Sequence, residues 1–207
     1  MVEEVEFSAE IIEYYADNGE KFATEQQIPT QGGNAVLRRL PIGPLLGIMP
    51  WNFPYYQVAR FAGPNLMLGN TIILKHAEIC PRSALRFEEL TREASIPAGV
   101  YTNVFATHEQ VSDIIADRRI QGISLTGSER AGAAVAAQAG EKLKRVVLEL
   151  GGTDPYILLD TDDVAAAAKL AFTTRMVNTG QACNSNKRMI VMEDIYDEFV
   201  AELVKLA

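Results

Sequence analysis

The sequence of 207 residues contains only two cysteines, Cys80 and Cys183, and only two histidines, His76 and His108. Two cysteines are too few for a disulfide framework or a structural zinc site, and the histidines form no metal-binding motif with them. We therefore expect no metal and a reducing compartment. No apolar run is long enough to span a bilayer, which predicts a protein without membrane contact.

Basic residues are also scarce, with 19 Lys and Arg against 27 Asp and Glu, a net charge of −8. This balance argues against a nucleic-acid partner. A small anionic substrate remains compatible, because one well-placed arginine outweighs a diffuse charge at short range. The N-terminus is acidic from its third residue, which is unlike a secretory or mitochondrial signal, so the expected location is the cytoplasm.

Apolar residues make up 48% of the chain and charged residues 22%, which is typical of a globular protein. Short apolar runs alternate with helix-like segments, and this alternation predicts βαβ crossovers and a parallel sheet. The expected strands are 35–40, 44–49, 70–75, 101–105, 120–125, 145–149, 155–159 and 188–192, and the expected helices are 5–18, 55–68, 82–94, 109–117, 128–139, 162–177 and 194–206.

A change of domain is expected near residue 151, where a strand ends at a Gly-Gly pair and a new strand follows. The block after it has only about 55 residues, which is small for a free-standing domain. The chain also stops at the end of an expected helix. We therefore expect residues 1–151 to form one domain and 152–207 to form the beginning of a second, apparently truncated one.

The segment Gly127–Gly132 follows an expected strand and begins an expected helix. Glycine lets the backbone approach a ligand, and a helix N-terminus offers free N–H groups to a phosphate. The segment has two glycines rather than the three of the dinucleotide fingerprint. Taken alone, it favours an ordinary turn with Ser128 as the N-cap.

Lys75-His76-Ala77-Glu78 lies at the carboxyl end of another expected strand, where parallel sheets bind their ligands. Lys75 and Glu78 could bind ribose hydroxyls there, and the Glu78 carboxylate would repel a 2′-phosphate. Solvated charge in a loop is the simpler interpretation of this segment alone.

Two further motifs follow expected strands. In Pro50-Trp51-Asn52-Phe53-Pro54, two prolines fix a loop and suit Asn52 to donate a hydrogen bond to an oxyanion, or Trp51 to pack in the core. Glu149 ends an apolar strand, where burial would favour its protonated form and make it a candidate general base. A glutamate side chain that reaches solvent is the alternative.

Cys183 lies in a polar loop, G-Q-A-C-N-S-N-K-R, between an expected helix and an expected strand. Structural cysteines usually occupy apolar runs, whereas a loop thiol near cations can act as a nucleophile. Cys80 precedes a proline at a helix start, and we interpret it as a bystander.

These motifs, in this order, resemble the aldehyde dehydrogenase superfamily over residues 1–207. The matching motifs are P-W-N-F-P, K-x-x-E after a strand, T-G-S-x-x-x-G, L-E-L-G-G and G-Q-x-C-x-x-x-x-R. K-H-A, A-G-A-A-V-A-A-Q-A-G and L-E-L-G-G-T-D-P-Y-I resemble the succinate-semialdehyde dehydrogenases within it. The resemblance covers the middle of the family's chain. It implies an α/β fold with a Rossmann-like dinucleotide-binding domain and the beginning of an α/β catalytic domain.

The resemblance implies a role for each matching residue. Cys183 would attack the aldehyde carbon, Asn52 would hold the oxyanion with the backbone N–H of Cys183, and Glu149 would activate the hydrolytic water. Arg60, eight residues after Asn52, would bind the far carboxylate of succinate semialdehyde, or would be an ordinary surface arginine. The positions implied to contact the cofactor are Trp51, Asn52, Lys75, His76, Ala77, Glu78, Gly127, Ser128 and Leu150.

The expected cofactor is NAD, favoured by Glu78, although NADP is used by related enzymes. The complete protein is expected to be a dimer or tetramer, and the strand element near 33–40 could belong to an oligomerisation arm. Asn184 and Ser185 stand where some relatives carry a second cysteine, so we expect no local disulfide switch.

Two alternatives to a succinate-semialdehyde dehydrogenase remain open from the sequence. One is an aldehyde dehydrogenase for another short aldehyde, and the other is a catalytically incompetent fragment that binds nucleotide. The chain lacks the family's second cofactor-binding glutamate and its later substrate loops, so we expect these 207 residues alone to be a poor catalyst.

Overall fold

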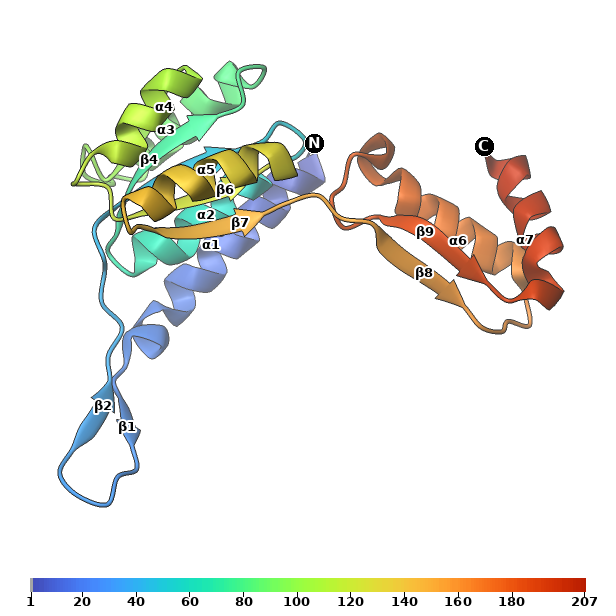
Figure 1. Cartoon of the computed structure of the whole chain (residues 1–207), viewed down its shortest axis with the longest axis horizontal. Coiled ribbons are helices and arrows are strands. Elements are labelled where there is room, and N and C mark those ends of the chain that lie inside the picture. Colours follow the sequence, from blue (N-terminus) through green and yellow to red (C-terminus); the bar gives the residue numbers. More distant parts are fainter. Residues whose placement is uncertain (1) are drawn as a thin grey trace. The chain divides into compact units, whose positions relative to one another are not determined.

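A computed structural model describes residues 2–207, which form two compact units (Figure 1). The first unit ends at Glu149 and the second comprises Leu150–Ala207. None of the helices in the described chain combines the length and apolarity needed to cross a membrane.

The first unit is built on a five-stranded sheet in the order β5-β4-β3-β6-β7, with all neighbouring strands parallel. The strands are β3 (Pro44–Met49), β4 (Thr71–His76), β5 (Tyr101–Val104), β6 (Gly122–Thr126) and β7 (Arg145–Glu149). The order reverses between β3 and β6, which are neighbours. In parallel sheets such a reversal opens a crevice for ligands at the carboxyl ends of the two strands.

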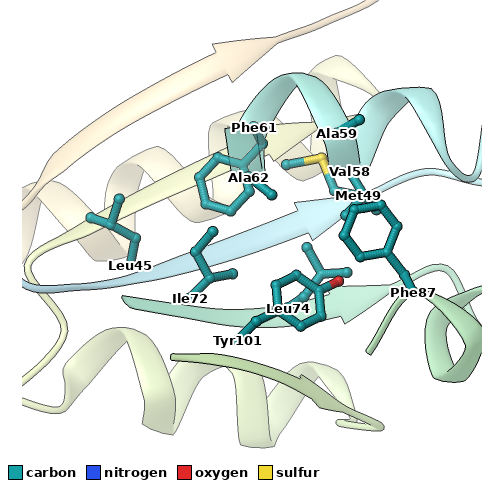
Figure 2. Packing of buried hydrophobic residues seen from close by; sticks show 10 residues of the cluster. All are labelled: Leu45, Met49, Val58, Ala59, Phe61, Ala62, Ile72, Leu74, Phe87 and Tyr101. Carbon is teal, nitrogen blue, oxygen red and sulfur yellow. The ribbon is translucent and has the colours of Figure 1, made fainter. Parts of the chain in front are cut away.

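Helices cover both faces of this sheet. They are α1 (Val2–Ala23), α2 (Tyr56–Met67), α3 (Pro81–Glu93), α4 (His108–Ala116) and α5 (Glu129–Glu141). One core cluster joins α2 and α3 to the sheet, so these helices share a face; Figure 2 shows its members, which are Leu45, Met49, Val58, Ala59, Phe61, Ala62, Ile72, Leu74, Phe87 and Tyr101. Helix α1 packs on α2, and α4 and α5 pack together on the opposite face.

A two-stranded antiparallel hairpin connects α1 to the sheet. It pairs β1 (Gln26–Ile28) with β2 (Ala35–Leu37), and its side chains are largely exposed. The sequence predicted a strand over 35–40 but not its partner, because Gln-Gln-Ile is polar and too short to show a period. The observed strand is also shorter than predicted, since it can extend only as far as its partner.

The second unit pairs two parallel strands, β8 (Asp154–Leu158) and β9 (Asn186–Val191). Helices α6 (Val164–Met176) and α7 (Glu193–Leu206) pack on them around Phe199, which is almost fully buried. A 3-10 turn, η1 (Val177–Gly180), follows α6. The helix predicted over 162–177 therefore ends one residue early, because Asn178 and Thr179 adopt left-handed backbone angles.

The mixed α/β class with a parallel central sheet, predicted from the alternation of segments, is confirmed. The predicted strands 44–49 and 145–149 coincide with β3 and β7. The N-terminal helix is longer than predicted, running over residues 2–23 rather than 5–18. The apolar stripe of this helix is shorter than the helix itself, and packing against α2 stabilises the additional residues.

Candidate functional site

The candidate residues of the first unit follow the carboxyl ends of four strands. Asn52 follows β3, Lys75 is the second-to-last residue of β4, Ser128 follows β6, and Glu149 ends β7. The register aligns these ends, since Ile48 pairs with both Lys75 and Leu125, and Thr126 pairs with Glu149. The tertiary structure thus brings four separated motifs to one edge of one sheet.

A cavity of about 390 Å³ lies on the sheet face that α4 and α5 cover. Lys75 and Ser128, two of the predicted cofactor residues, line it, together with apolar side chains such as Ile48, Leu125 and Val135. Apolar walls with a few polar groups are typical of small-molecule sites. The cavity adjoins the point where the strand order reverses, so its place and lining fit a dinucleotide.

The N-terminus of α5 lies at this cavity. Ser128 caps the helix, because its Oγ accepts a hydrogen bond of 3.3 Å from the backbone N–H of Ala131. The capped turn that the sequence predicted is therefore present, and the same Ser128 also lines the cavity. Gly127 is held against β7 by a 2.9 Å hydrogen bond from its backbone N–H to the Glu149 carbonyl.

Four polar residues of this cavity were not predicted from the sequence, namely His108, Ser112, Arg130 and Gln138. Arg130 lies inside the Gly127–Gly132 motif, so its position beside the expected helix N-terminus was the available signal. His108 begins α4, which only the folded sheet brings opposite α5.

Lys75 and Glu78 form a loose ion pair, with Nζ and Oε1 4.0 Å apart. The Lys75 side chain is only 11% exposed, whereas that of Glu78 is 77% exposed. Because the pair is solvated on the Glu78 side, it leaves the Lys75 ammonium group able to bind another anion.

His76 is buried, and the backbone occupies both of its ring nitrogens. Nε2 donates to the Pro54 carbonyl at 2.9 Å, and Nδ1 accepts from the Ala77 N–H at 2.8 Å. Burial lowers the pKa of His76 below its usual value, and this outweighs the hydrogen bond to Pro54. His76 is therefore a neutral histidine that ties the Pro50–Pro54 loop to β4, and any contact with a cofactor would involve its backbone.

The Pro50–Pro54 loop has Trp51 on its outer side, with 45% of that residue exposed. Trp51 thus does not pack in the core, which was the structural alternative for it. The Trp51 carbonyl faces the Cys80 thiol, with sulfur and oxygen 3.8 Å apart. The loop leads into α2, which carries the candidate residue Arg60.

A second cavity, of about 470 Å³, lies on the opposite sheet face, beside α1 and α2. Its wall includes Gln57, Arg60, Thr126 and Glu149. The sheet separates it from the α4–α5 cavity. The carboxyl end of β6 contributes to both walls, with Thr126 in this cavity and Leu125 in the other. Glu149 therefore lines a cavity on the α1–α2 side of the sheet, whereas Lys75 and Ser128 line one on the α4–α5 side.

Arg60 lines this second cavity, and its guanidinium contacts three groups. Its Nη2 donates to Thr126 Oγ1 at 3.2 Å and lies 3.7 Å from Glu149 Oε2, and its carbon lies 5.6 Å from the centre of the Tyr56 ring. The Arg60 side chain is 30% exposed. It is thus a partly buried cation in a cavity wall rather than an ordinary surface arginine.

The premise that Glu149 is buried is wrong for the first unit, since its side chain is 53% exposed. The alternation along β7 turns the Glu149 side chain toward the cavity, and β7 is an edge strand with no neighbour beyond it in this unit. Its candidate role therefore rests on its position at the carboxyl edge and not on burial.

The loop that carries Cys183 lies in the second unit and is fixed by two cations. Arg175 Nη1 donates to the Gly180 carbonyl at 2.8 Å, and Lys187 Nζ donates to the carbonyls of Cys183 and Gly152 at 2.9 and 2.7 Å. Gly180 adopts a left-handed backbone, and a side chain there would meet the Arg175 guanidinium at 2.7 Å. The backbone on both sides of the thiol is therefore held by hydrogen bonds from these two cations.

The two thiols differ in their surroundings. Cys80 precedes α3, and burial, followed by the charge of Glu4, raises the pKa of its thiol. Cys183 is partly buried in its polar loop. Among residues 2–207 no group of three or more His, Cys, Asp or Glu side chains is arranged to hold a metal ion.

A doubly wound parallel sheet with a ligand crevice at its strand reversal defines a dinucleotide-binding type of domain. The model of the aldehyde dehydrogenase family matches residues 1–207 of the chain. The chain therefore belongs to the aldehyde dehydrogenase family, as its motifs indicated.

Two curated relatives are named for one substrate. A succinate-semialdehyde dehydrogenase (NADP(+)) of Deinococcus radiodurans is 52% identical over 200 residues, which cover 97% of this chain and 42% of the relative. The succinate semialdehyde dehydrogenase (NAD(P)+) Sad of Escherichia coli is 42% identical over 204 residues, which cover 99% of this chain and 44% of the relative. The chain spans less than half the length of these relatives.

Among solved structures, the succinic semialdehyde dehydrogenase of Streptococcus pyogenes in complex with NADP+ superposes with a TM-score of 0.95 at 47% identity. The match covers 98% of this chain and 45% of that one. A salicylaldehyde dehydrogenase of Pseudomonas putida superposes with a TM-score of 0.92 at 34% identity, over 98% and 43% of the two chains.

Proposed function

We propose that in the complete enzyme this chain serves the oxidation of succinate semialdehyde to succinate with NAD(P)+. The observation that supports the proposal is a pair of cavities, one on each face of the sheet, each lined by residues at the carboxyl ends of the strands. One has the place and lining of a dinucleotide site, and the other contains the Arg60 guanidinium. The names of the relatives support the choice of substrate.

In this proposal Cys183 is the nucleophile. Its thiolate bonds to the aldehyde carbon, and the carbonyl oxygen becomes an oxyanion that the Asn52 amide and the Cys183 backbone N–H stabilise. The nicotinamide cofactor, when bound, accepts the hydride that leaves this carbon. The resulting Cys183 thioester is attacked by water, from which Glu149 removes a proton, and succinate and the thiolate are released.

The cofactor would lie in the α4–α5 cavity, with its phosphates at the N-terminus of α5 and its ribose near Lys75 and Glu78. We propose that NAD is used and that NADP is also accepted. Glu78 opposes a 2′-phosphate, whereas Lys75 and Arg130 attract one, and the relatives are named for NADP(+) or NAD(P)+. The exposure of Glu78 weakens its repulsion, because solvent screens it.

Arg60 is proposed to bind the carboxylate at the far end of the substrate. A guanidinium fork matches a carboxylate, and Arg60 is held in place by Thr126 and Tyr56 before substrate arrives. Both short contacts of Arg60 with Thr126 and Glu149 involve Nη2, so its other N–H groups are not needed for them.

The test is cofactor reduction by the complete enzyme, followed by absorbance. Succinate semialdehyde is compared with butyraldehyde and acetaldehyde, each with NAD and NADP. We expect a strong preference for succinate semialdehyde, and Arg60→Ala should raise its KM by about 10- to 100-fold with little effect on butyraldehyde. Equal effects of Arg60→Ala on both aldehydes would refute the substrate assignment, and activity retained in Cys183→Ala would refute the mechanism.

We also propose that the β1–β2 hairpin is an oligomerisation arm. Its residues expose apolar side chains, including Ile28, Val36 and Leu37, and its edges have no further strand partners in the described chain. Exposed strand edges of this kind pair readily with another chain. Replacing residues 26–37 by a short Gly-Ser linker should reduce the mass of the complete enzyme in solution, as measured by light scattering.

A further inference from the structure

Gln57 is a buried polar residue without an evident partner. It is only 1% exposed, and no hydrogen-bond donor for its Oε1 lies among residues 2–207. A buried amide oxygen without a donor destabilises a fold, so each such group in a folded protein calls for an explanation. The backbone N–H of Gln57 does bond, to the Phe53 carbonyl at 3.0 Å, but this helical bond does not involve the side chain.

The position of Gln57 suggests that reason. It is the second residue of α2, and Arg60 follows three residues later, so the two side chains share one face of the helix. Both line the α1–α2 cavity, together with Thr126 and Glu149. An amide and a guanidinium therefore stand side by side in a concave wall.

Asn65, another amide in the same wall, provides a contrast. Its Nδ2 donates to the Phe61 carbonyl at 2.8 Å, and its Oδ1 accepts from Asn70 Nδ2 at 3.2 Å. The Asn65 amide is thus bonded to the protein at both ends. Gln57 lies in the same helix and lines the same cavity, but its amide oxygen accepts no hydrogen bond from the described residues.

We propose that Gln57 is a specificity-determining residue, whose amide binds the far carboxylate of the substrate together with Arg60. This inference rests on the proposed function, because it concerns the same substrate. The terminal side-chain bond of glutamine rotates easily, so the amide can turn its N–H toward a carboxylate oxygen. Its Oε1 can then accept from the Arg60 guanidinium, which lies within reach on the same helix face.

The division of labour follows from charge. Arg60 supplies the cation that a carboxylate needs, and Gln57 supplies a directed donor without burying a second charge. A neutral aldehyde of the same length would gain nothing from either group. The pair therefore selects aldehydes with a carboxylate at the opposite end of a short chain.

The test uses Gln57→Leu and Gln57→Glu in the complete enzyme, with succinate semialdehyde and butyraldehyde as substrates of equal carbon number. Gln57→Leu should raise the KM for succinate semialdehyde about tenfold, leave its kcat within about twofold, and leave butyraldehyde unaffected. Gln57→Glu should raise that KM further, because two carboxylates would face each other. Gln57→Leu should also raise the melting temperature, since it removes an unbonded buried amide.

Asn65→Leu is the matched control. It should lower the melting temperature without changing the ratio of the two KM values, because it breaks bonds that belong to the fold. If Gln57→Leu changes neither KM, or changes both equally, while Arg60→Ala still discriminates between the substrates, the role of Gln57 is refuted and the proposed substrate stands. If Arg60→Ala does not discriminate either, the proposed substrate falls, and the role of Gln57 falls with it.

Discussion

The Glu4 carboxylate in α1 accepts a hydrogen bond of 2.7 Å from the backbone N–H of Tyr55, at the start of α2. The same oxygen accepts from the N–H of Tyr56 at 3.1 Å. The side chain of Tyr55 itself does not cap the helix. A residue 51 positions earlier therefore provides the cap for the helix that carries Gln57 and Arg60, and holds the end of the Pro50–Pro54 loop.

Removing this cap should destabilise the first unit. Glu4→Ala leaves two N–H groups of the first turn of α2 without an acceptor, which costs about 1–2 kcal/mol of unfolding free energy. Glu4→Gln keeps an acceptor oxygen and should cost less. Chemical denaturation measures both, and Glu3→Ala, at an exposed position of the same helix, is the control and should change little. Equal stability of Glu4→Ala and Glu3→Ala would contradict the capping role.

The two thiols should react at different rates. Burial raises the pKa of Cys80, so little of it is thiolate near pH 7.5. Cys183 lies instead in a polar loop whose backbone Lys187 holds through the Cys183 carbonyl. We expect iodoacetamide to modify Cys183 roughly ten times faster than Cys80, because alkylation requires the thiolate. Peptide mass mapping over time gives both rates in one sample. Similar slow rates at both sites would indicate that Cys183 is not an activated nucleophile in this chain.

Stability should fall on mild acidification because of His76. Burial lowers its folded pKa below 6.5, so the unfolded chain binds a proton that the folded chain does not. Its contribution is fully present above pH 6.5 and is lost as the pH falls from there through the folded pKa. His76→Asn should reduce the difference in unfolding free energy between pH 7.5 and 5.5. An unchanged difference in His76→Asn would show that His76 is not its source.

Gly47 in β3 should tolerate no side chain. A Cβ there would lie 2.5 Å from Cε1 of Phe61 and 3.0 Å from Cδ1 of Leu74, both in the packed core. Gly47→Ala should therefore cost about 1–3 kcal/mol. Gly140→Ala, in α5 with open space around it, should be neutral or stabilising by up to about 1 kcal/mol. A thermal melt of each variant checks the contrast, and a neutral Gly47→Ala would show that the core relaxes.

Cofactor preference should depend on Glu78. Its carboxylate lies 4.0 Å from the Lys75 ammonium group and would repel a 2′-phosphate bound there. Glu78→Ser in the complete enzyme should raise the ratio of kcat/KM for NADP to that for NAD by about tenfold, mainly through the KM for NADP. Glu141→Ser, an exposed acidic position at the opposite end of α5, is a charge-matched control. No change in Glu78→Ser would place the 2′-position away from Lys75.

The sequence by itself determined the α/β class, the alternation of elements and the family. Periodicity and turn residues are local features, so the bounds of β3 and β7 could be predicted residue by residue. The order of the motifs along the chain indicated the family, which the family model confirms. These motifs surround Asn52, Lys75, Gly127, Glu149 and Cys183. The roles of these residues, including that of Cys183, stay predictions that the experiments above test.

Only the tertiary structure decided which residues share a wall. The reversal of strand order between β3 and β6 places Lys75 with Arg130 on one face, and Gln57 with Arg60 and Glu149 on the other. The tertiary structure also buries His76 with hydrogen bonds at both ring nitrogens, and it leaves the Glu149 side chain half exposed. These outcomes depend on contacts between segments far apart in sequence, because burial and hydrogen-bond partners are set by what packs alongside and not by the residue's own neighbours in the chain.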